Sequence, residues 1–317
     1  MHPDPNPMPN INLSEWNELA PLQLPRAGCA VGVLSGELIV AGGTYWRDGR
    51  KFWCEQVDGF DPRTNRWTAR TPIPRPCGDA GAVAHDETLY IFGGGTDGVA
   101  ESTVWALHDK KWSALSHLTL PAPRRSSGVA VVEGTFYLLG GLAGTGSDFG
   151  SATTTVWAAK PTGPWAVRAP MPGPARFNTS VATVGDRIIV AGGCTPENGV
   201  VRNLDEILAY DPRQDEWTLL GRLPFANRAA AGLADGDGLL MFGGYTDKFE
   251  DGIFRYDVPS GEVRSVGRLP VALAGPHFLR VGTQILGATG ENGIKMRFPG
   301  LLASAGARQP PGCPKPL

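Results

Sequence analysis

Three residues near the carboxyl end of the sequence have side chains suited to acid–base chemistry. Glu291 stands beside Gly290, Arg297 follows six residues later, and His277 precedes both. A carboxylate can take a proton from a hydroxyl group at neutral pH, and a guanidinium can orient it or stabilise an oxyanion. An imidazole can supply a proton. We therefore predict Glu291 as a base, Arg297 as its partner and His277 as a candidate acid.

Each of these residues also has a purely structural interpretation. Glu291 and Arg297 could form an ordinary salt bridge across a tight turn, which contributes little when it is exposed. The Asn292–Gly293 pair favours positive φ angles and fits a short hairpin at that turn. His277 could be a histidine whose hydrogen bonds are satisfied within its loop. The sequence leaves these alternatives open.

The surrounding sequence is a repeat. Five apolar runs end in a pair of glycines, as in "LIVAGG" at Gly42 and Gly43, and a sixth run, "ILGATG", has Thr289 in place of the first glycine. We interpret this replacement as drift of the last copy. At the position after the pair, only the sixth copy has a formal charge, Glu291. The other diglycines are Gly93–Gly94, Gly140–Gly141, Gly192–Gly193 and Gly243–Gly244.

The rest of each copy is also repeated. A turn and a tryptophan follow most copies, as in "FDPRTNRW" and "YDPRQDEW", and a proline-containing segment closes the unit. A period near 50 residues with a diglycine resembles the kelch repeat, in which one copy forms one four-stranded blade of a β-propeller. The resemblance covers about Ser14 to Ala305. We expect the tryptophans to fill space between adjacent blades.

The count of copies predicts an all-β, six-bladed kelch propeller in one domain over residues 11–305. The sixth unit lacks an outer strand, whereas Glu15 to Ala20 resembles one, so we expect the N-terminal strand to close blade six. Residues 1–10 and the proline-rich residues 306–317 are predicted to be flexible tails.

The channel mouth is where a propeller commonly binds a ligand, because several loops converge there. The links between blades carry a recurring arginine, which could clamp a carboxylate or phosphate or could bond to neighbouring backbone. A long aromatic loop, "TYWRDGRKFW", could hold a sugar ring or pack on itself. The predicted binding residues are Arg26, Trp46, Lys51, Arg75, Arg125, Arg176, Asn178, Arg228 and Tyr245.

The segment "GENGIKMR" resembles the catalytic segment of the kelch-type sugar mutarotases, the family of the bacterial N-acetylneuraminate epimerase. The aromatic loop and the split sixth blade resemble the cyclically permuted branch of that family. The resemblance implies an isomerase that interconverts the anomers of a cyclic sugar such as sialic acid, with Glu291 and Arg297 as the catalytic pair. The alternative is a non-catalytic kelch module that binds an acidic protein or peptide on its loop face.

Composition narrows the other expectations. The net charge of −2 and the lack of a basic run disfavour nucleic acid as the main partner. No apolar run is long enough to span a membrane, and the N-terminus has no secretory signal, so we expect a cytoplasmic monomer or weak homodimer. The five cysteines are odd in number and lack CxxC spacing, which favours free thiols. No cofactor and no metal site are expected.

Overall fold

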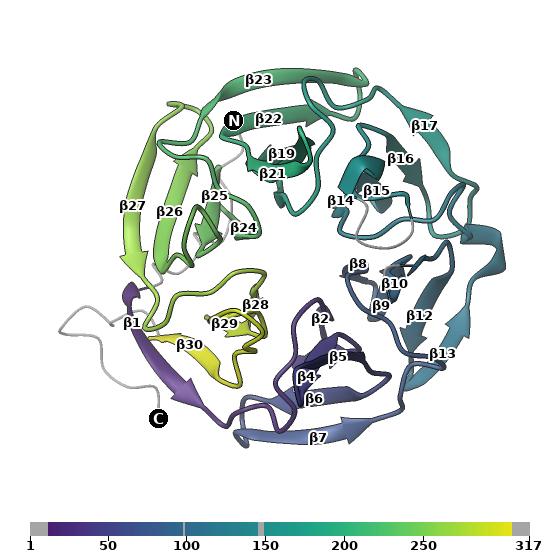
Figure 1. Ribbon diagram of the computed structural model, residues 1–317, viewed down its shortest axis with the longest axis vertical. Coiled ribbons are helices and arrows are strands. Elements are labelled where there is room, and N and C mark those ends of the chain that lie inside the picture. The colour runs from purple at the N-terminus through teal and green to yellow at the C-terminus, as the bar shows by residue number, and fades with distance from the viewer. Residues whose placement is uncertain (1–11, 98, 145–148, 306–317) are drawn as a thin grey trace, which may run out of the picture.

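Six four-stranded antiparallel sheets form a ring around a central channel (Figure 1). The structure is a computed structural model that describes residues 12–97, 99–144 and 149–305. Each sheet is one blade, and in five blades the strands follow chain order from the channel to the rim. The predicted all-β, six-bladed architecture is confirmed.

The first three blades have the following strands. Blade one comprises β2 (Ala30–Leu34), β3 (Glu37–Ala41), β6 (Val57–Asp61) and β7 (Arg66–Arg70). Blade two comprises β8 (Gly81–His85), β9 (Thr88–Phe92), β12 (Val104–His108) and β13 (Lys111–Ala114). Blade three comprises β14 (Gly128–Val132), β15 (Thr135–Leu139), β16 (Val156–Ala159) and β17 (Ala166–Arg168).

The other three blades repeat this order, except that the first strand of the chain completes the last blade. Blade four comprises β18 (Ser180–Val184), β19 (Arg187–Ala191), β22 (Glu206–Asp211) and β23 (Glu216–Arg222). Blade five comprises β24 (Ala231–Asp235), β25 (Gly238–Phe242), β26 (Gly252–Asp257) and β27 (Val263–Arg268). Blade six comprises β28 (His277–Val281), β29 (Gln284–Ala288), β30 (Leu301–Ala305) and β1 (Asn12–Leu19).

Blade six joins the two ends of the described chain, as predicted. Strand β1 pairs antiparallel with β30, with Leu19 opposite Leu301 and Asn17 opposite Ala303. The ring of Trp16 packs edge-on against Phe278, with 5.6 Å between centroids. The predicted tails, residues 1–10 and 306–317, lie outside the described residues.

Four tryptophans of the repeat lie on outer strands or just before them, and each is bonded to the segment that ends the preceding blade. The indole nitrogen of Trp67 donates to the carbonyl of Ala20 at 2.7 Å. Three others make the equivalent bond at 2.8 Å: Trp112 to Thr71, Trp165 to Leu118 and Trp217 to Ala169. Because the indole fills space and also donates a hydrogen bond, it fastens one blade to the next.

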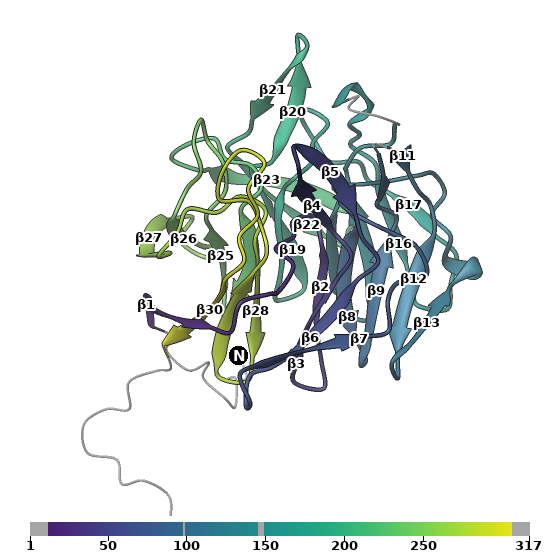
Figure 2. The ribbon, with the colours of Figure 1, turned by 60° about the horizontal axis from the view of Figure 1, so that its bottom comes forward.

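The loops between the second and third strands stand on one face of the ring together with the links between blades, and we call this the loop face (Figure 2). Several of these loops are ordered as small elements. They are the hairpins β4 (Thr44–Arg47)–β5 (Arg50–Trp53), β10 (Gly95–Thr96)–β11 (Val99–Ala100) and β20 (Cys194–Glu197)–β21 (Val200–Asn203), and the 3₁₀ turn η2 (Phe149–Ser151). A second 3₁₀ turn, η1 (Ser116–Leu118), lies in the link after blade two.

The diglycines connect neighbouring blades through the backbone. The amide of Gly94 donates to the carbonyl of Arg124 in the next link at 2.8 Å, and Gly43, Gly141, Gly193 and Gly244 do the same. The glycine before each of these has a φ between +58° and +64°. A Cβ there would overlap that same carbonyl oxygen. The glycines are therefore required by the contact between blades as well as by the turn.

Candidate functional site at the channel mouth

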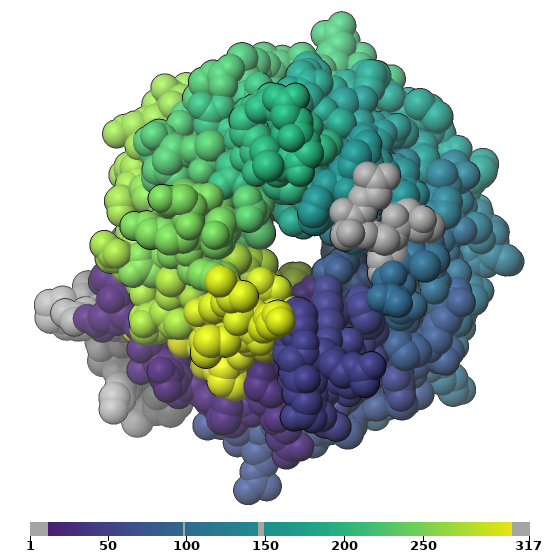
Figure 3. All heavy atoms as spheres, viewed as in Figure 1, coloured from purple at the N-terminus to yellow at the C-terminus, as the bar shows by residue number. Residues whose placement is uncertain are grey.

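A cavity of about 1030 Å³ occupies the channel and opens on the loop face. All six blades contribute residues to its lining. The space-filling view shows the hollow at the centre of the ring (Figure 3). A cavity of this size can hold a small molecule or a side chain of a partner.

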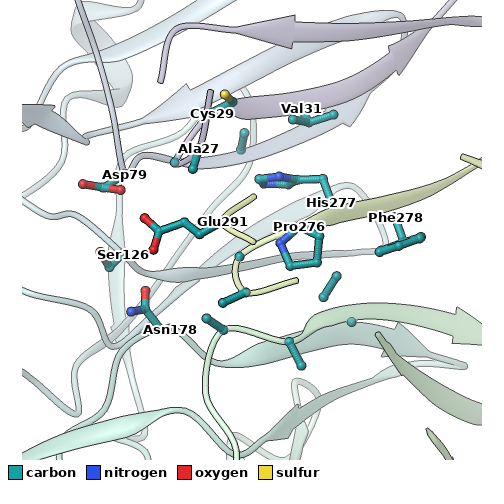
Figure 4. A pocket seen from close by; sticks show the side chains of 18 of the residues that line it. Ala27, Cys29, Val31, Asp79, Ser126, Asn178, Pro276, His277, Phe278 and Glu291 are labelled. Carbon is teal, nitrogen blue, oxygen red and sulfur yellow. The ribbon is translucent and has the colours of Figure 1, made fainter. Parts of the chain in front are cut away.

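The mouth of the cavity is framed by one residue from each link between blades. These six residues share a left-handed backbone, with φ between +52° and +64°, and they are Gly28, Asp79, Ser126, Asn178, Ala229 and Gly275. Five backbone hydrogen bonds of 2.7 to 3.2 Å join them in order, each running from an amide to the carbonyl of the preceding blade. We call this set the inner ring. One half of the inner ring has polar side chains, those of Asp79, Ser126 and Asn178 (Figure 4). The other half consists of two glycines and an alanine.

Glu291 lies opposite the polar half of the inner ring, with its carboxylate in the cavity (Figure 4). Its Oε1 lies 2.7 Å from Nη1 of Arg297 and forms an ion pair with it. The Arg297 side chain is 6% exposed and that of Glu291 is 41% exposed. The predicted pairing of Glu291 with Arg297 is confirmed, and the carboxylate keeps access to the cavity.

The turn between these two residues differs from the expected Asn-Gly hairpin. Neither Asn292 nor Gly293 has a positive φ; the left-handed residue is Lys295, at +59°. The turn closes between Gly293 and Met296, whose amide donates to the Gly293 carbonyl at 3.0 Å. The tight turn is therefore formed by residues 293–296 and lies later in the sequence than the expected turn at Asn292 and Gly293.

His277 also lines the cavity, at the start of β28. Its Nδ1 lies 3.0 Å from Oγ1 of Thr289. Burial lowers the pKa of His277 to about 4, so the ring is neutral at pH 7. A neutral imidazole is a much weaker acid than the imidazolium ion, so at neutral pH His277 lacks the charged form that is the stronger proton donor.

The lowered pKa of His277 makes the stability of the fold depend on pH. Since the unfolded histidine titrates near pH 6.5, the unfolded state binds more protons than the folded state between about pH 4 and pH 6.5. We expect the free energy of unfolding to fall as the pH is lowered through this range. Urea unfolding of His277→Gln at several pH values should give a shallower dependence than the unmodified protein; identical pH profiles would contradict the burial of a neutral ring.

Aromatic and basic side chains surround the mouth above the inner ring. The Lys295 ammonium lies 5.0 Å from the centre of the Trp46 ring, and the Arg228 guanidinium lies 4.4 Å from that of Tyr245. Lys51 is 4.0 Å from Asp79. The residues predicted as ligand-binding that do line the cavity are Trp46, Lys51, Asn178, Arg228 and Tyr245.

The other predicted binding residues lie away from the cavity. Arg26 is fully buried and pairs with Asp58 at 2.7 Å, and Arg176 is fully buried and pairs with Glu206 at 2.6 Å. Each arginine connects the link that enters its blade to the third strand of that blade, and its side chain is too deeply buried to reach a ligand in the channel. We leave them out of the proposed site.

Arg75 and Arg125 are corrected in the same way, since neither lines the cavity. Arg75 pairs with Glu101 at 2.6 Å on an outer part of the loop face. The backbone of Arg125 bridges to Leu142 beside the third diglycine. The recurring arginines therefore occupy different positions in the blades and do not form one ring around the channel.

Asp79, Ser126 and Lys295 line the cavity but were not singled out in the sequence. Asp79 lies two residues after Cys77, and Ser126 directly follows Arg125. Asp79 and Ser126 stand at the same position in their links as Asn178 does in its own link. This equivalence becomes visible only when the links are aligned on the residue with positive φ.

The four cysteines among the described residues are free and buried: Cys29, Cys54, Cys77 and Cys194. Burial raises the pKa of Cys29, Cys77 and Cys194 to about 12, so these thiols are unreactive. Within the described ranges no three histidine, cysteine or acidic side chains converge as a metal would need. No helix in that part of the chain is long and apolar enough to cross a membrane.

Comparison with known sequences agrees with the repeat and the ring. Residues 76–119 and 175–224 match the family described as Kelch motif. The chain is a six-bladed β-propeller that contains kelch motifs. Kelch-like protein terF of Aspergillus terreus is 29% identical over 238 residues, which are 68% of this chain and 49% of that protein.

Two other relatives of the propeller extend this result. Kelch-like protein 34 of Homo sapiens is 30% identical over 69% of this chain and 34% of its own length. A kelch domain-containing protein of Archaeoglobus fulgidus is 29% identical over 70% of this chain and 64% of its own length. The propeller thus spans half or less of the first two relatives. None of these names denotes a mutarotase or an epimerase, so the comparisons support the kelch motif and not the narrower resemblance.

Proposed function

We propose that the propeller is a binding module whose loop face takes an acidic, partly apolar segment of a partner protein. The observation that carries this proposal is the distribution of exposed apolar side chains. Of the eight large hydrophobic side chains that are exposed among the described residues, six belong to loops of this face. We call them the apolar crown: Phe52, Val99, Phe149, Val200, Ile294 and Met296.

The crown draws on five of the six blades. Ile294, at the tip of the blade-six loop, is 87% exposed, and Val200 stands at the end of the β20–β21 hairpin. Blade five adds Tyr245 and Phe249, which pack edge to face with 5.3 Å between ring centroids. Apolar groups gathered around a polar cavity on one face are typical of a surface that binds a protein.

The charges around the mouth favour an acidic partner. Among the described residues no carboxylate pairs with Lys295 or Arg228, although both border the cavity. Several carboxylates of the loop face already have an arginine partner: Glu101 with Arg75, Glu197 with Arg202, and Asp205 with Arg222. The aromatic rings beneath Lys295 and Arg228 hold these cations in place and reduce the entropy lost on binding.

A displayed peptide library selected against the folded propeller would test this proposal. We expect the selected peptides to combine acidic and apolar residues, and Ile294→Asp or Arg228→Glu to weaken a selected peptide by at least about tenfold. Val167→Asp is the matched control, because Val167 is 74% exposed on the outer strand β17. Equal loss of affinity in the control, or selection of basic peptides, would contradict the proposal.

A second candidate is the acid–base interconversion of a cyclic sugar in the cavity. The Glu291–Arg297 pair favours it, because the carboxylate faces Asp79, Ser126 and Asn178 across a cavity wide enough for a sugar. NMR saturation transfer between the anomers of sialic acid and of common aldoses tests it. Acceleration that is lost in Glu291→Gln would support the isomerase, whereas the same exchange rate with and without protein would exclude it for those sugars.

A further inference from the structure

The six seams between adjacent blades are not equivalent. At five of them two backbone bonds recur: the bond from the second glycine of the diglycine to the next link, and the bond between neighbouring members of the inner ring. Both are absent between blade six and blade one, where Gly290 would donate to Arg26 and Gly28 would donate to Gly275. The circle of backbone bonds is therefore interrupted at one place, within residues that are all described.

The cause of the interruption is a single side chain. Thr289 occupies the position of the first glycine and has the same left-handed backbone, with a φ of +62°. In the other five blades a Cβ at this position would overlap the carbonyl oxygen of the next link. Thr289 has that Cβ and is 1% exposed, so the Arg26 carbonyl cannot approach as its equivalents do. The replacement of this glycine, which looked like drift of the repeat, has a structural consequence.

A β-branched residue in the left-handed region is strained, and such strain persists only where neighbouring contacts hold it. Here the Thr289 hydroxyl lies 3.0 Å from Nδ1 of His277. That bond keeps the threonine side chain directed toward β28. The strained residue is thus bonded to His277, which lines the cavity.

Side-chain bonds replace the missing backbone bonds across this seam. Arg297 of blade six donates through Nε to the Thr44 carbonyl and through Nη2 to the Thr44 hydroxyl of blade one, each at 3.2 Å. Its Nη1 forms an ion pair with Glu291 at 2.7 Å. One guanidinium therefore spans the seam and holds the carboxylate at the channel mouth.

We propose that the seam between blade six and blade one is a hinge in the ring, wedged open by the Cβ of Thr289 and latched by Arg297. Side-chain bonds of this kind exchange faster than a backbone ladder, so the hinge opens more readily than the other five seams. Opening removes Arg297 from Thr44 and moves the loop that carries Glu291 and Lys295. The position of Glu291 in the cavity is therefore set by the closure of the ring. This inference does not depend on what the loop face binds.

Amide hydrogen exchange measured by NMR on the folded protein tests the wedge. In Thr289→Gly we expect the amides of Gly28 and Gly290 to exchange about tenfold more slowly, because both missing bonds can form. In Thr289→Ala, which keeps the Cβ and loses only the hydroxyl, these amides should exchange as in the unmodified protein. The amides of Gly94 and Ser126, which are bonded at ordinary seams, serve as internal references. No slowing in Thr289→Gly, or equal slowing in both variants, would overturn the wedge.

A second variant tests the latch. Lysine at position 297 can still pair with Glu291 but cannot bond two groups of Thr44 at once. In Arg297→Lys we expect amides of residues 289–300 to exchange at least about fivefold faster, with the loops of blades two to four unchanged. Faster exchange throughout the ring would indicate general destabilisation and contradict a local hinge, as would unchanged exchange in residues 289–300.

Discussion

Replacing Arg26 with alanine is expected to lower the free energy of unfolding by about 3–5 kcal/mol, because it leaves the Asp58 carboxylate buried without its cation. The Arg26 side chain has no exposed surface, and that of Asp58 is 10% exposed. The same guanidinium also donates to the carbonyls of Gln56 and Val40, which lose a donor in the variant. Urea or thermal unfolding followed by circular dichroism measures the change.

The matched control is Arg268→Ala. Arg268 bonds Asp251 with two nitrogens, as closely as 2.7 Å, but its side chain is 76% exposed. Water can replace this partner, so the expected loss is below about 1 kcal/mol. Similar losses for the two variants would mean that Arg26 is accessible to solvent, and would return it to the set of residues that a ligand could reach.

Arg26 and Arg176 are buried within blades, whereas Arg228 lines the cavity, and this difference shows how far the sequence could predict the site. Six copies of a repeat in phase predicted the blades, their strand order and the closure by the N-terminal strand, because each copy must bury its faces against its neighbours. The same repetition was misleading for Arg26 and Arg176. An arginine stands at the position of Arg26 and Arg176 in only three of the six links, and the link turns these two side chains into the blade. No pattern in the sequence records that direction.

The sequence could identify a site residue whose type differs from that at the same position in the other copies of the repeat. It could not identify site residues that differ in no such way. Glu291 was found because it alone carries a charge after the glycine pair, and the spacing to Arg297 allowed the ion pair that the structure contains. Asp79 and Ser126 were missed because their inward direction comes from a positive φ within the links. Only three-dimensional alignment of the links brings these residues to one level of the channel.

The loop face and the hinge meet in one segment, residues 289–300. Ile294 and Met296 of the apolar crown belong to it, and so do Glu291 and Arg297. A partner that covers Ile294 would press on a loop that contacts blade one through the bonds from Arg297 to Thr44 and the Lys295–Trp46 contact, and the link to blade one through the Leu22–Pro299 backbone bond. Binding at the crown would then be coupled to the position of the carboxylate in the cavity, by a path of directly bonded groups.

Replacing the first glycine of a diglycine is expected to destabilise the contact between two blades. Gly93→Ala is expected to cost about 3 kcal/mol, because alanine is strained at a φ of +64° and its Cβ would displace the Arg124 carbonyl from the Gly94 amide. Equilibrium unfolding in urea would measure this loss. Gly36→Ala is the control: its φ is +78°, but nothing lies within 4 Å of the added Cβ, so only the backbone cost of about 1 kcal/mol remains.

The difference between Gly93→Ala and Gly36→Ala isolates the contact between blades from the conformational preference of glycine. If the two variants lose the same stability, the glycine of the repeat serves only the turn, and Thr289 could not act as a wedge by its Cβ. If Gly93→Ala loses about 2 kcal/mol more, the repeat keeps glycine because five seams require close backbone contact. The sixth seam then tolerates Thr289 because contacts away from the channel, the bond from Trp67 to the Ala20 carbonyl and the bond from the Leu22 amide to the Pro299 carbonyl, still hold blade six to blade one.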